Sequence, residues 1–456
     1  MTIARSQSIQ SWRDLPWGAI RLAVVVGGGL LVLQSSPDLD APKLAYLAVA
    51  GIAFAGSLRS VTVGPARALA RTYLHILISV AVFSVVLAGS FVVSAINGTR
   101  TIDWVRDVVG YALFAAVPVL AIDAAATTSK RFLIGFLTVV GLLASLSWAV
   151  EWLQRRLIID LPFDRLLLPA GQVAVALYAF ALAAAIKRRD IPLAWAATAG
   201  IVLGLFLVTG TRSSIVLLVI PLAIWLAARP REIGHGTRVV GIHLVAALAI
   251  FAVVQLALEP APDAPVASPS PGGAVGSPGG GAASPVAVAT PSPEAPSALD
   301  RFLSIEALAN DPSFKERAAQ YGAAWDLFLS SPVVGVGPGH PIEWTDVSGL
   351  PRDDFFADTP LVFPAKFGLV GIEALGFVVV SYVRLFVGVV KRGGWTAEAL
   401  GLCGYGLVTS VGLPLGMPIE DKSFGFALLL LVALALSASH DPLMATAQPA
   451  SQRTER

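Results

Sequence analysis

Long apolar runs alternate with short polar loops along almost the whole chain of 456 residues. A helix needs roughly 17 to 25 mostly apolar residues to cross about 30 Å of hydrocarbon. About twelve runs approach that length, and they lie at 17–35, 43–58, 74–95, 108–126, 132–153, 168–186, 193–210, 213–228, 239–257, 365–390, 396–414 and 423–438. The pattern therefore predicts an all-α polytopic membrane protein of about twelve transmembrane helices.

Lysine and arginine collect in every second loop, and this sets the orientation because basic loops stay on the cytoplasmic side. With the N-terminus inside, the inner loops carry Arg59, Arg67, Arg71, Lys130, Arg131, Lys187, Arg188, Arg189, Arg229, Arg231, Arg238, Lys391 and Arg392. Acidic or mixed groups at 38–40, 103–107 and 420–422 fall in the outer loops. We expect a multi-pass protein of the bacterial cytoplasmic (inner) membrane with both termini in the cytoplasm.

One predicted outer loop, 154–167, departs from this rule because it carries Arg155, Arg156 and Arg165. Either the topology is wrong there or the loop binds an anionic ligand. The regular alternation on both sides favours the ligand.

The largest loop lies between the ninth and tenth runs and has two parts. Residues 259–298 are rich in Pro, Gly and Ser, with almost no charge and no apolar period, so they are predicted to be a disordered insertion. Residues 299–364 carry an amphipathic helical pattern at 314–329 and are predicted to be ordered. The remaining divisions are a membrane domain at 1–258, helices ten to twelve at 365–438 and a cytoplasmic tail at 439–456.

Composition agrees with a membrane protein, since 55% of residues are hydrophobic, 14% are charged and the mean hydropathy is +0.74. A formal net charge of +2 gives no basis for nucleic-acid binding. The single cysteine, Cys403, excludes an intramolecular disulfide and a cysteine-based metal site. We expect no cofactor and no metal. No cleavable signal is evident, so the first helix is expected to act as its own insertion signal.

A tight outer turn, Thr209 to Ser214, holds Arg212 at the membrane boundary. An arginine buried there costs several kcal/mol unless an anion or carboxylate compensates it, which makes Arg212 a candidate ligand residue. The alternative is that its side chain reaches the lipid headgroups.

The segment Ser331 to His340 places Gly335, Gly337 and Gly339 within five residues. Glycines at that spacing permit positive φ angles and close backbone approach, and successive N–H groups can line an anion site. A plain turn is the alternative. Arg317, on the amphipathic helix that leads into the segment, is its expected basic partner, and a solvated surface charge is the plainer interpretation of this residue.

Two acidic residues flank the start of the tenth span. Asp358 lies where the chain re-enters the membrane and can act as a general base, with Asp353 and Asp354 as competitors. Asp358 or Thr359 can instead cap the helix, with Pro360 at its first position. Glu373, inside the span, needs a partner such as Arg212 or Arg317; Glu151 is a weaker candidate for that partnership.

Taken in order, these features resemble the O-antigen ligase and O-antigen polymerase (Wzy-type) family. The resemblance rests on an outward turn with Arg212, a large outer loop with Arg317, an aromatic helix and Pro332-x-x-Gly-x-Gly-x-Gly339, and a span with Gly368-Leu-x-Gly371. It covers about Leu193 to Val390. It implies a GT-C-like membrane fold of about twelve helices, with the large periplasmic loop between helices nine and ten.

The resemblance also implies an activity, namely transfer or polymerisation of glycans carried on undecaprenyl pyrophosphate, for surface or exopolysaccharide synthesis in the cell envelope. Its implied partners are the lipid-linked oligosaccharide, membrane lipid and other polysaccharide-export proteins. Implied catalytic residues are Asp358, Arg212 and Arg317. The implied substrate-binding residues are Gly335, Gly337, Gly339, His340 and Glu373.

One departure from the family pattern bears on the activity. Ligases of the family carry a His-Asn pair ahead of the Gly-x-x-Gly motif, and here Ala357 and Asp358 stand in its place. Asp358 can take over as the base, His340 can reach in from the glycine-rich segment, or the chain can be a non-catalytic relative. A flippase or transporter of lipid-linked oligosaccharide is the rival function, although the internal repeats and broken mid-membrane helices of transporters are not found in the sequence. A non-catalytic subunit of an export complex is the third.

Overall fold

The computed structural model of the protein describes residues 17–33, 39–157, 171–188, 191–208, 217–227, 230–258, 312–355, 357–413, 419 and 421–440. Arg155 and Arg156, which the sequence placed in an outer loop at 154–167, lie at the end of a helix that runs from Lys130 to Leu157. Arg212, Arg165 and the proposed insertion at 259–298 lie outside the described residues. The predictions made for them therefore stay predictions.

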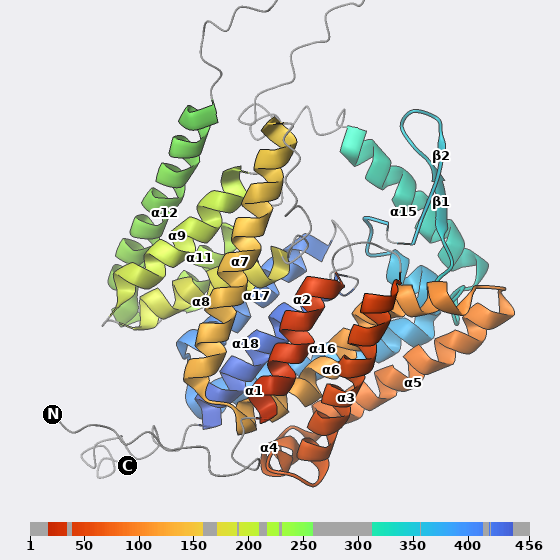
Figure 1. Cartoon of the computed structure of the whole chain (residues 1–456), viewed down its shortest axis with the longest axis horizontal. Coiled ribbons are helices and arrows are strands. Elements are labelled where there is room, and N and C mark those ends of the chain that lie inside the picture. The colour runs from red at the N-terminus through yellow and green to blue at the C-terminus, as the bar shows by residue number, and fades with distance from the viewer. Residues whose placement is uncertain are drawn as a thin grey trace, which may run out of the picture.

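Helices dominate the described residues (Figure 1). Seven are long and apolar enough to cross a membrane, namely α3 (Ala41–Thr62), α5 (Leu74–Ile96), α6 (Thr101–Thr127), α7 (Lys130–Leu157), α12 (Pro230–Leu258), α16 (Val362–Gly393) and α18 (Lys422–His440). Shorter apolar helices are the continuous stretch α1 (Trp17–Leu22), η2 (Ala23–Gly28) and α2 (Gly29–Val32), then α8 (Gly171–Lys187) and α9 (Pro192–Val208). The remaining helices are α4 (Arg67–Thr72), α11 (Val219–Ala227), α15 (Pro312–Ser330) and α17 (Ala397–Gly412). A helical, multi-pass membrane architecture is thus confirmed.

Burial separates central helices from peripheral ones. Helix α8 is buried along nearly its whole length, and α18 packs between α6, α8 and α17. Both are apolar on all sides, as expected for helices surrounded by other helices. By contrast, α3, α5 and α12 expose large apolar side chains, for example Ile52, Val85 and Val245. Such faces are suited to lipid.

The fourth span begins earlier than the sequence predicts. The apolar run at 108–126 placed Asp103 and Asp107 in an outer loop, whereas α6 starts at Thr101 and carries both in its first two turns. Both carboxylates are buried, at 7% and 1% residue exposure. The prediction was wrong because a hydropathy window assigns charged residues to loops. In the folded chain, ion pairs compensate these two charges, so both residues can lie in a buried helix.

At the upper right of Figure 1, above α5 and α6, lie α15 and a two-stranded hairpin, β1 (Ile342–Thr345) and β2 (Pro351–Asp354). Helix α15 confirms the helix predicted at 314–329. The hairpin was not predicted. Asp346 organises its turn by accepting hydrogen bonds from the backbone of Ser348 and Leu350 and from Arg352. These bonds, that of Leu350 first, hold the pKa of Asp346 below its usual value.

A small core joins this outer segment to the membrane helices. It consists of Ala324 on α15, Ile342 on β1, Ala357, and Val362 at the start of α16. Trp344 Nε1 also donates to Glu316 Oε1 at 3.0 Å, linking β1 to α15. We call this the outer end of the molecule, following the predicted topology.

Candidate functional site

The glycine-rich segment Ser331 to His340 is docked into a break in α16. Gly368 interrupts that helix with φ 61° and ψ −163°. Backbone groups freed by the break bond to the segment: Leu369 N–H to Pro332 O at 2.9 Å, Val370 N–H to Val333 O at 3.1 Å, Val336 N–H to Ala365 O at 3.0 Å and Gly337 N–H to Lys366 O at 3.0 Å. The two motifs therefore form one structural unit, although about thirty residues separate them.

All three glycines of the segment have positive φ, at 72°, 88° and 80° for Gly335, Gly337 and Gly339, which is the conformation that glycine permits. A Cβ on Gly335 would lie 2.3 Å from the backbone of Lys366, and one on Gly337 would lie 2.4 Å from Ser94 Oγ. On Gly339 it would lie 2.6 Å from the backbone N of Trp104. The close approach that glycine permits is thus an approach to α16, α5 and α6.

A fully buried ion pair holds the end of this segment in place. Lys366 Nζ lies 2.7 Å from Asp107 Oδ1, and both side chains have 0% exposure. The second oxygen of Asp107 accepts the Gly339 N–H at 2.6 Å, while Lys366 also donates to the carbonyl of Phe355. The Lys366–Asp107 pair therefore joins α6, the glycine-rich segment, α16 and Phe355, the residue that follows β2.

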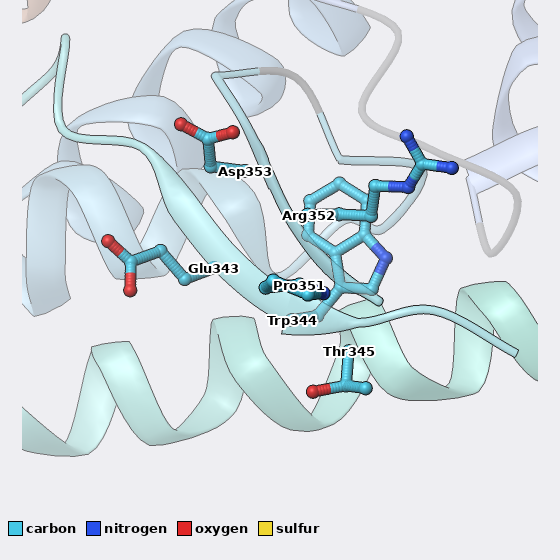
Figure 2. A pocket seen from close by; sticks show the side chains of 6 residues that line it. All are labelled: Glu343, Trp344, Thr345, Pro351, Arg352 and Asp353. Atoms are coloured by element: carbon cyan, nitrogen blue, oxygen red, sulfur yellow. The ribbon is translucent and has the colours of Figure 1, made fainter. Parts of the chain in front are cut away.

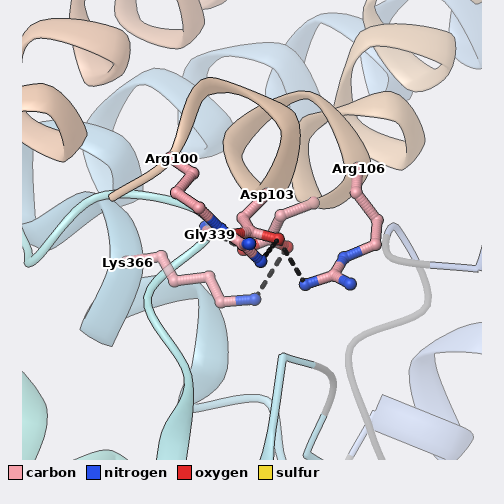
Figure 3. A network of polar contacts seen from close by, with 6 residues as sticks. Arg100, Asp103, Arg106, Gly339 and Lys366 are labelled. Carbon is pink, nitrogen blue, oxygen red and sulfur yellow. Dashed lines mark hydrogen bonds and ion pairs between the residues drawn. The ribbon is translucent and has the colours of Figure 1, made fainter. Parts of the chain in front are cut away.

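Three more charged residues lie beside that pair, namely Arg100, directly before α6, and Asp103 and Arg106, in its first two turns (Figure 3). Asp103 accepts from Arg100 Nε at 2.7 Å and from Arg100 Nη2 at 3.3 Å. Arg106 Nη2 lies 3.1 Å from the same carboxylate, and its guanidinium stacks on the Phe355 ring at 3.7 Å.

The structure brings together two of the predicted catalytic residues. Arg317 on α15 lies 3.5 Å from Asp358, with Nη2 facing Oδ2. The backbone N–H of Asp358 donates to Gln320 Oε1 at 2.7 Å, which fixes the loop to α15. Asp358 is exposed, and the Nε of Arg317 is buried without a hydrogen bond in the described part of the chain.

The helix-cap interpretation fails for Asp358 and holds in part for Thr359. Helix α16 begins at Val362 with Leu361 as its N-cap, and no side chain caps it. Thr359 is fully buried, and its hydroxyl accepts the Leu361 N–H at 3.2 Å, in the turn that leads into the helix. Asp358 is thus left facing outward, in its ion pair with Arg317.

Ala357 occupies the position at which the family resemblance expects a histidine. Its side chain is 3% exposed and packs in the small core with Ala324 and Ile342. An imidazole there would overfill this core. Of the two positions, only 358 presents its side chain outward.

The other predicted residues are more dispersed. His340 is half-buried directly after Gly339, and Glu373 is exposed on α16 beyond the break. Arg317 pairs with Asp358 and not with Glu373, for which the described residues offer no ion pair. Arg212 lies outside the described residues.

Sequence reasoning missed Asp107, Lys366 and Arg106. The available signal was a lysine just inside a predicted membrane segment, because an ionisable residue at that depth needs a partner. The partner could not be identified, since Asp107 lies 259 positions away.

A hollow of about 440 Å³ lies on the hairpin and is lined by Glu343, Trp344, Thr345, Pro351, Arg352 and Asp353 (Figure 2). Glu343 and Asp353 are directly opposite each other in the strand register. Two facing carboxylates repel an anion, and Arg352 is already paired with Asp346 at 2.9 Å. This hollow is therefore a poor site for phosphate.

Comparison with protein-family models gives a match to part of the chain. Residues 195–360 match the family model described as O-antigen ligase. The match begins within α9, includes Arg317, the glycine-rich segment and Asp358, and ends two residues before α16. No curated protein matches the chain with significance. The resemblance drawn from the sequence motifs is confirmed over this region.

Proposed function

We propose that this protein, whose residues 195–360 match the O-antigen ligase family, is a glycosyltransferase of the bacterial cytoplasmic membrane. It transfers or polymerises glycans delivered on undecaprenyl pyrophosphate at the outer face. The observation that carries the proposal is the Arg317–Asp358 pair, which joins a cation to a carboxylate within the family-matched region. Nucleotide sugars are cytoplasmic, so a site at the outer face calls for a lipid-linked donor.

The reaction needs two contributions from the protein. An acceptor hydroxyl oxygen forms a bond to the anomeric carbon while the bond from that carbon to the pyrophosphate oxygen breaks. A base takes the hydroxyl proton, and cations stabilise the charge on the departing undecaprenyl pyrophosphate. Asp358 is the proposed base, because it is exposed and ionisable at the mouth of α16.

Arg317 is a proposed ligand of the pyrophosphate, together with Arg212. A guanidinium presents five donors in a fork that matches phosphate oxygens. Arg317 engages one carboxylate oxygen at 3.5 Å and keeps a buried Nε without a hydrogen bond in the described part of the chain. It therefore has unused donor capacity. Since these arginines neutralise the leaving group, we expect the reaction to proceed without a metal ion.

The glycine-rich segment serves this scheme as a fixed support. Gly335, Gly337 and Gly339 hold it against three helices, and Asp107 and Lys366 fix its end. Rigid placement of reacting groups contributes to catalysis by lowering the entropic cost of the transition state. His340, at the end of the segment, and Glu373 on α16 are the remaining proposed substrate contacts.

The test is reconstitution of the purified protein in vesicles with undecaprenyl-pyrophosphate-linked oligosaccharide, followed by glycan sizing. We expect elongated glycan from the wild type and a loss of about 10²-fold or more for Asp358→Asn. Arg317→Gln should lower the rate comparably. The matched control is Asp353→Asn, a carboxylate exposed on β2. Equal elongation by Asp358→Asn and wild type would refute the site. Lipid translocation without any elongation would favour the flippase.

A further inference from the structure

Arg106 is an arginine with unused donors in a mostly buried place. Its side chain is 14% exposed. Its Nε and Nη2 atoms are buried and carry no hydrogen bond in the described part of the chain. Buried guanidinium groups are normally satisfied, because leaving their N–H groups unpaired costs free energy. The side chain is therefore arranged for a partner that is not part of the described chain.

Asp103, the carboxylate that contacts Arg106 in the described part of the chain, does not balance its charge. Asp103 already receives two hydrogen bonds from Arg100, at 2.7 and 3.3 Å, and contacts Arg106 at 3.1 Å without hydrogen-bond geometry. Asp107, the next acidic residue on α6, is committed to Lys366. Two guanidinium groups thus share one carboxylate, which leaves an excess positive charge on the buried member.

A further cation, Lys422, lies near Arg106, and Lys43 lies near Lys422. Lys43, at the start of α3, is 2% exposed, and its ammonium is 3.8 Å from Asp40. Lys422, at the start of α18, lies close enough to interact electrostatically with Lys43, Asp421 and Arg106. The ammonium of Lys422 donates to the Leu33 carbonyl at 3.4 Å, and Asp40 and Asp421 accompany the two lysines. Among the described residues the four cations Arg100, Arg106, Lys43 and Lys422 therefore face three carboxylates, Asp103, Asp40 and Asp421, and the remaining positive charge favours an anionic ligand.

This place adjoins the proposed reaction centre. The guanidinium of Arg106 stacks on Phe355, and Asp358 lies three residues further along the same loop. Three residues span at most about 11 Å. The stacking fixes the orientation of Arg106 on the side of the loop facing α6, while Arg317 approaches the loop from α15.

We propose that Arg106, with Lys422 and Lys43 beside it, forms a second anion subsite that binds the diphosphate group of a polyprenyl-linked substrate. The inference rests on the proposed function, which it extends. A polymerising transferase has two lipid-linked substrates, and the second diphosphate needs its own cations near the acceptor side of the base. Neither Arg106 nor the two lysines lie in the family-matched region.

The test measures binding, independently of glycan transfer. Purified protein in phosphatidylcholine nanodiscs is titrated with farnesyl pyrophosphate, and its affinity is compared among variants. Arg106→Gln should weaken binding at least about tenfold, as expected for loss of charge-assisted hydrogen bonds. Arg106→Lys should weaken it less. Arg384→Gln is the matched control, since it removes the same charge from an exposed side chain on α16 that takes no part in this cluster; we expect less than about a threefold change.

The outcomes separate the possibilities. Unchanged affinity in Arg106→Gln, or no binding by the wild type, would overturn the subsite. If phosphatidylglycerol, but not inorganic pyrophosphate, displaces the probe with the same dependence on Arg106, the ligand is a phospholipid headgroup and the proposal is overturned. If Arg106→Gln aggregates in gel filtration, the affinity of Arg106→Lys and of Lys422→Gln for farnesyl pyrophosphate is measured instead. Wild-type affinity in both variants would overturn the subsite.

Failure of the subsite and failure of the proposed function are distinguishable. Binding that depends on Arg106, in a protein that elongates no glycan, keeps the subsite and removes the enzyme. If elongation depends on Asp358 but the affinity for farnesyl pyrophosphate does not depend on Arg106, the proposed function stands and the proposed subsite is rejected.

Discussion

Replacing Lys366 by methionine tests whether the buried pair with Asp107 holds the outer end together. At 2.7 Å the Coulomb attraction amounts to about 6 kcal/mol for an effective dielectric constant of about 20. Desolvation of both groups offsets much of it, so the pair adds little net stability. Removing one partner, however, leaves the other charge buried without compensation, at a cost of about 3–5 kcal/mol. Lys366→Met also removes the donor to the Phe355 carbonyl.

The assay is equilibrium unfolding in mixed micelles, monitored by tryptophan fluorescence, with protease cleavage of the outer segment as a local readout. Arg384→Met is the matched control, because Arg384 is exposed on the same helix; we expect about 0.5 kcal/mol or less. Asp107→Asn combined with Lys366→Met removes both charges, keeps an acceptor for the Gly339 N–H, and should cost less than the sum of the single changes.

Two results would refute the reasoning. One is a Lys366→Met protein as stable as Arg384→Met. The other is strict additivity in the double variant, because additivity means that the two residues do not stabilise each other.

Two further predictions concern the same end of the molecule. Gly337→Ala should destabilise the protein by at least about 1 kcal/mol, since φ is 88° and the new Cβ would lie 2.4 Å from Ser94 Oγ. The control is Gly376→Ala on α16, whose new Cβ would meet nothing within 4 Å, so this variant should be neutral or stabilising. Equal melting temperatures for the two variants would contradict the prediction. Burial raises the pKa of Asp421 to about 6 from 3.8. The folded state therefore binds the proton more tightly than the unfolded state, and stability falls as pH rises from about 4 to about 6. Asp421→Asn should flatten the unfolding profile over that window, and an unchanged slope would show that Asp421 does not cause it.

The membrane architecture followed from the sequence because hydrocarbon imposes a local rule. Each span must be long, apolar and helical on its own account, so a window of residues contains the information. The same local logic predicted the helix at 314–329 from its amphipathic spacing. The spacing of Gly335, Gly337 and Gly339 permitted the positive φ angles that the structure shows. The hairpin escaped because Pro351 to Asp354 has no alternation of apolar and polar residues.

What only the tertiary structure decided is which charges meet. Asp107 was assigned to a loop and Lys366 had no assigned partner, yet together they fix the glycine-rich segment. Arg317 and Asp358 are likewise joined by folding, as are Arg106 and Phe355. Hydropathy reports the cost of burying a charge but not its compensation, which depends on a second residue far along the chain. For that reason the sequence determined the helices and supplied the candidate residues, while their assembly into a site at the outer end required the fold.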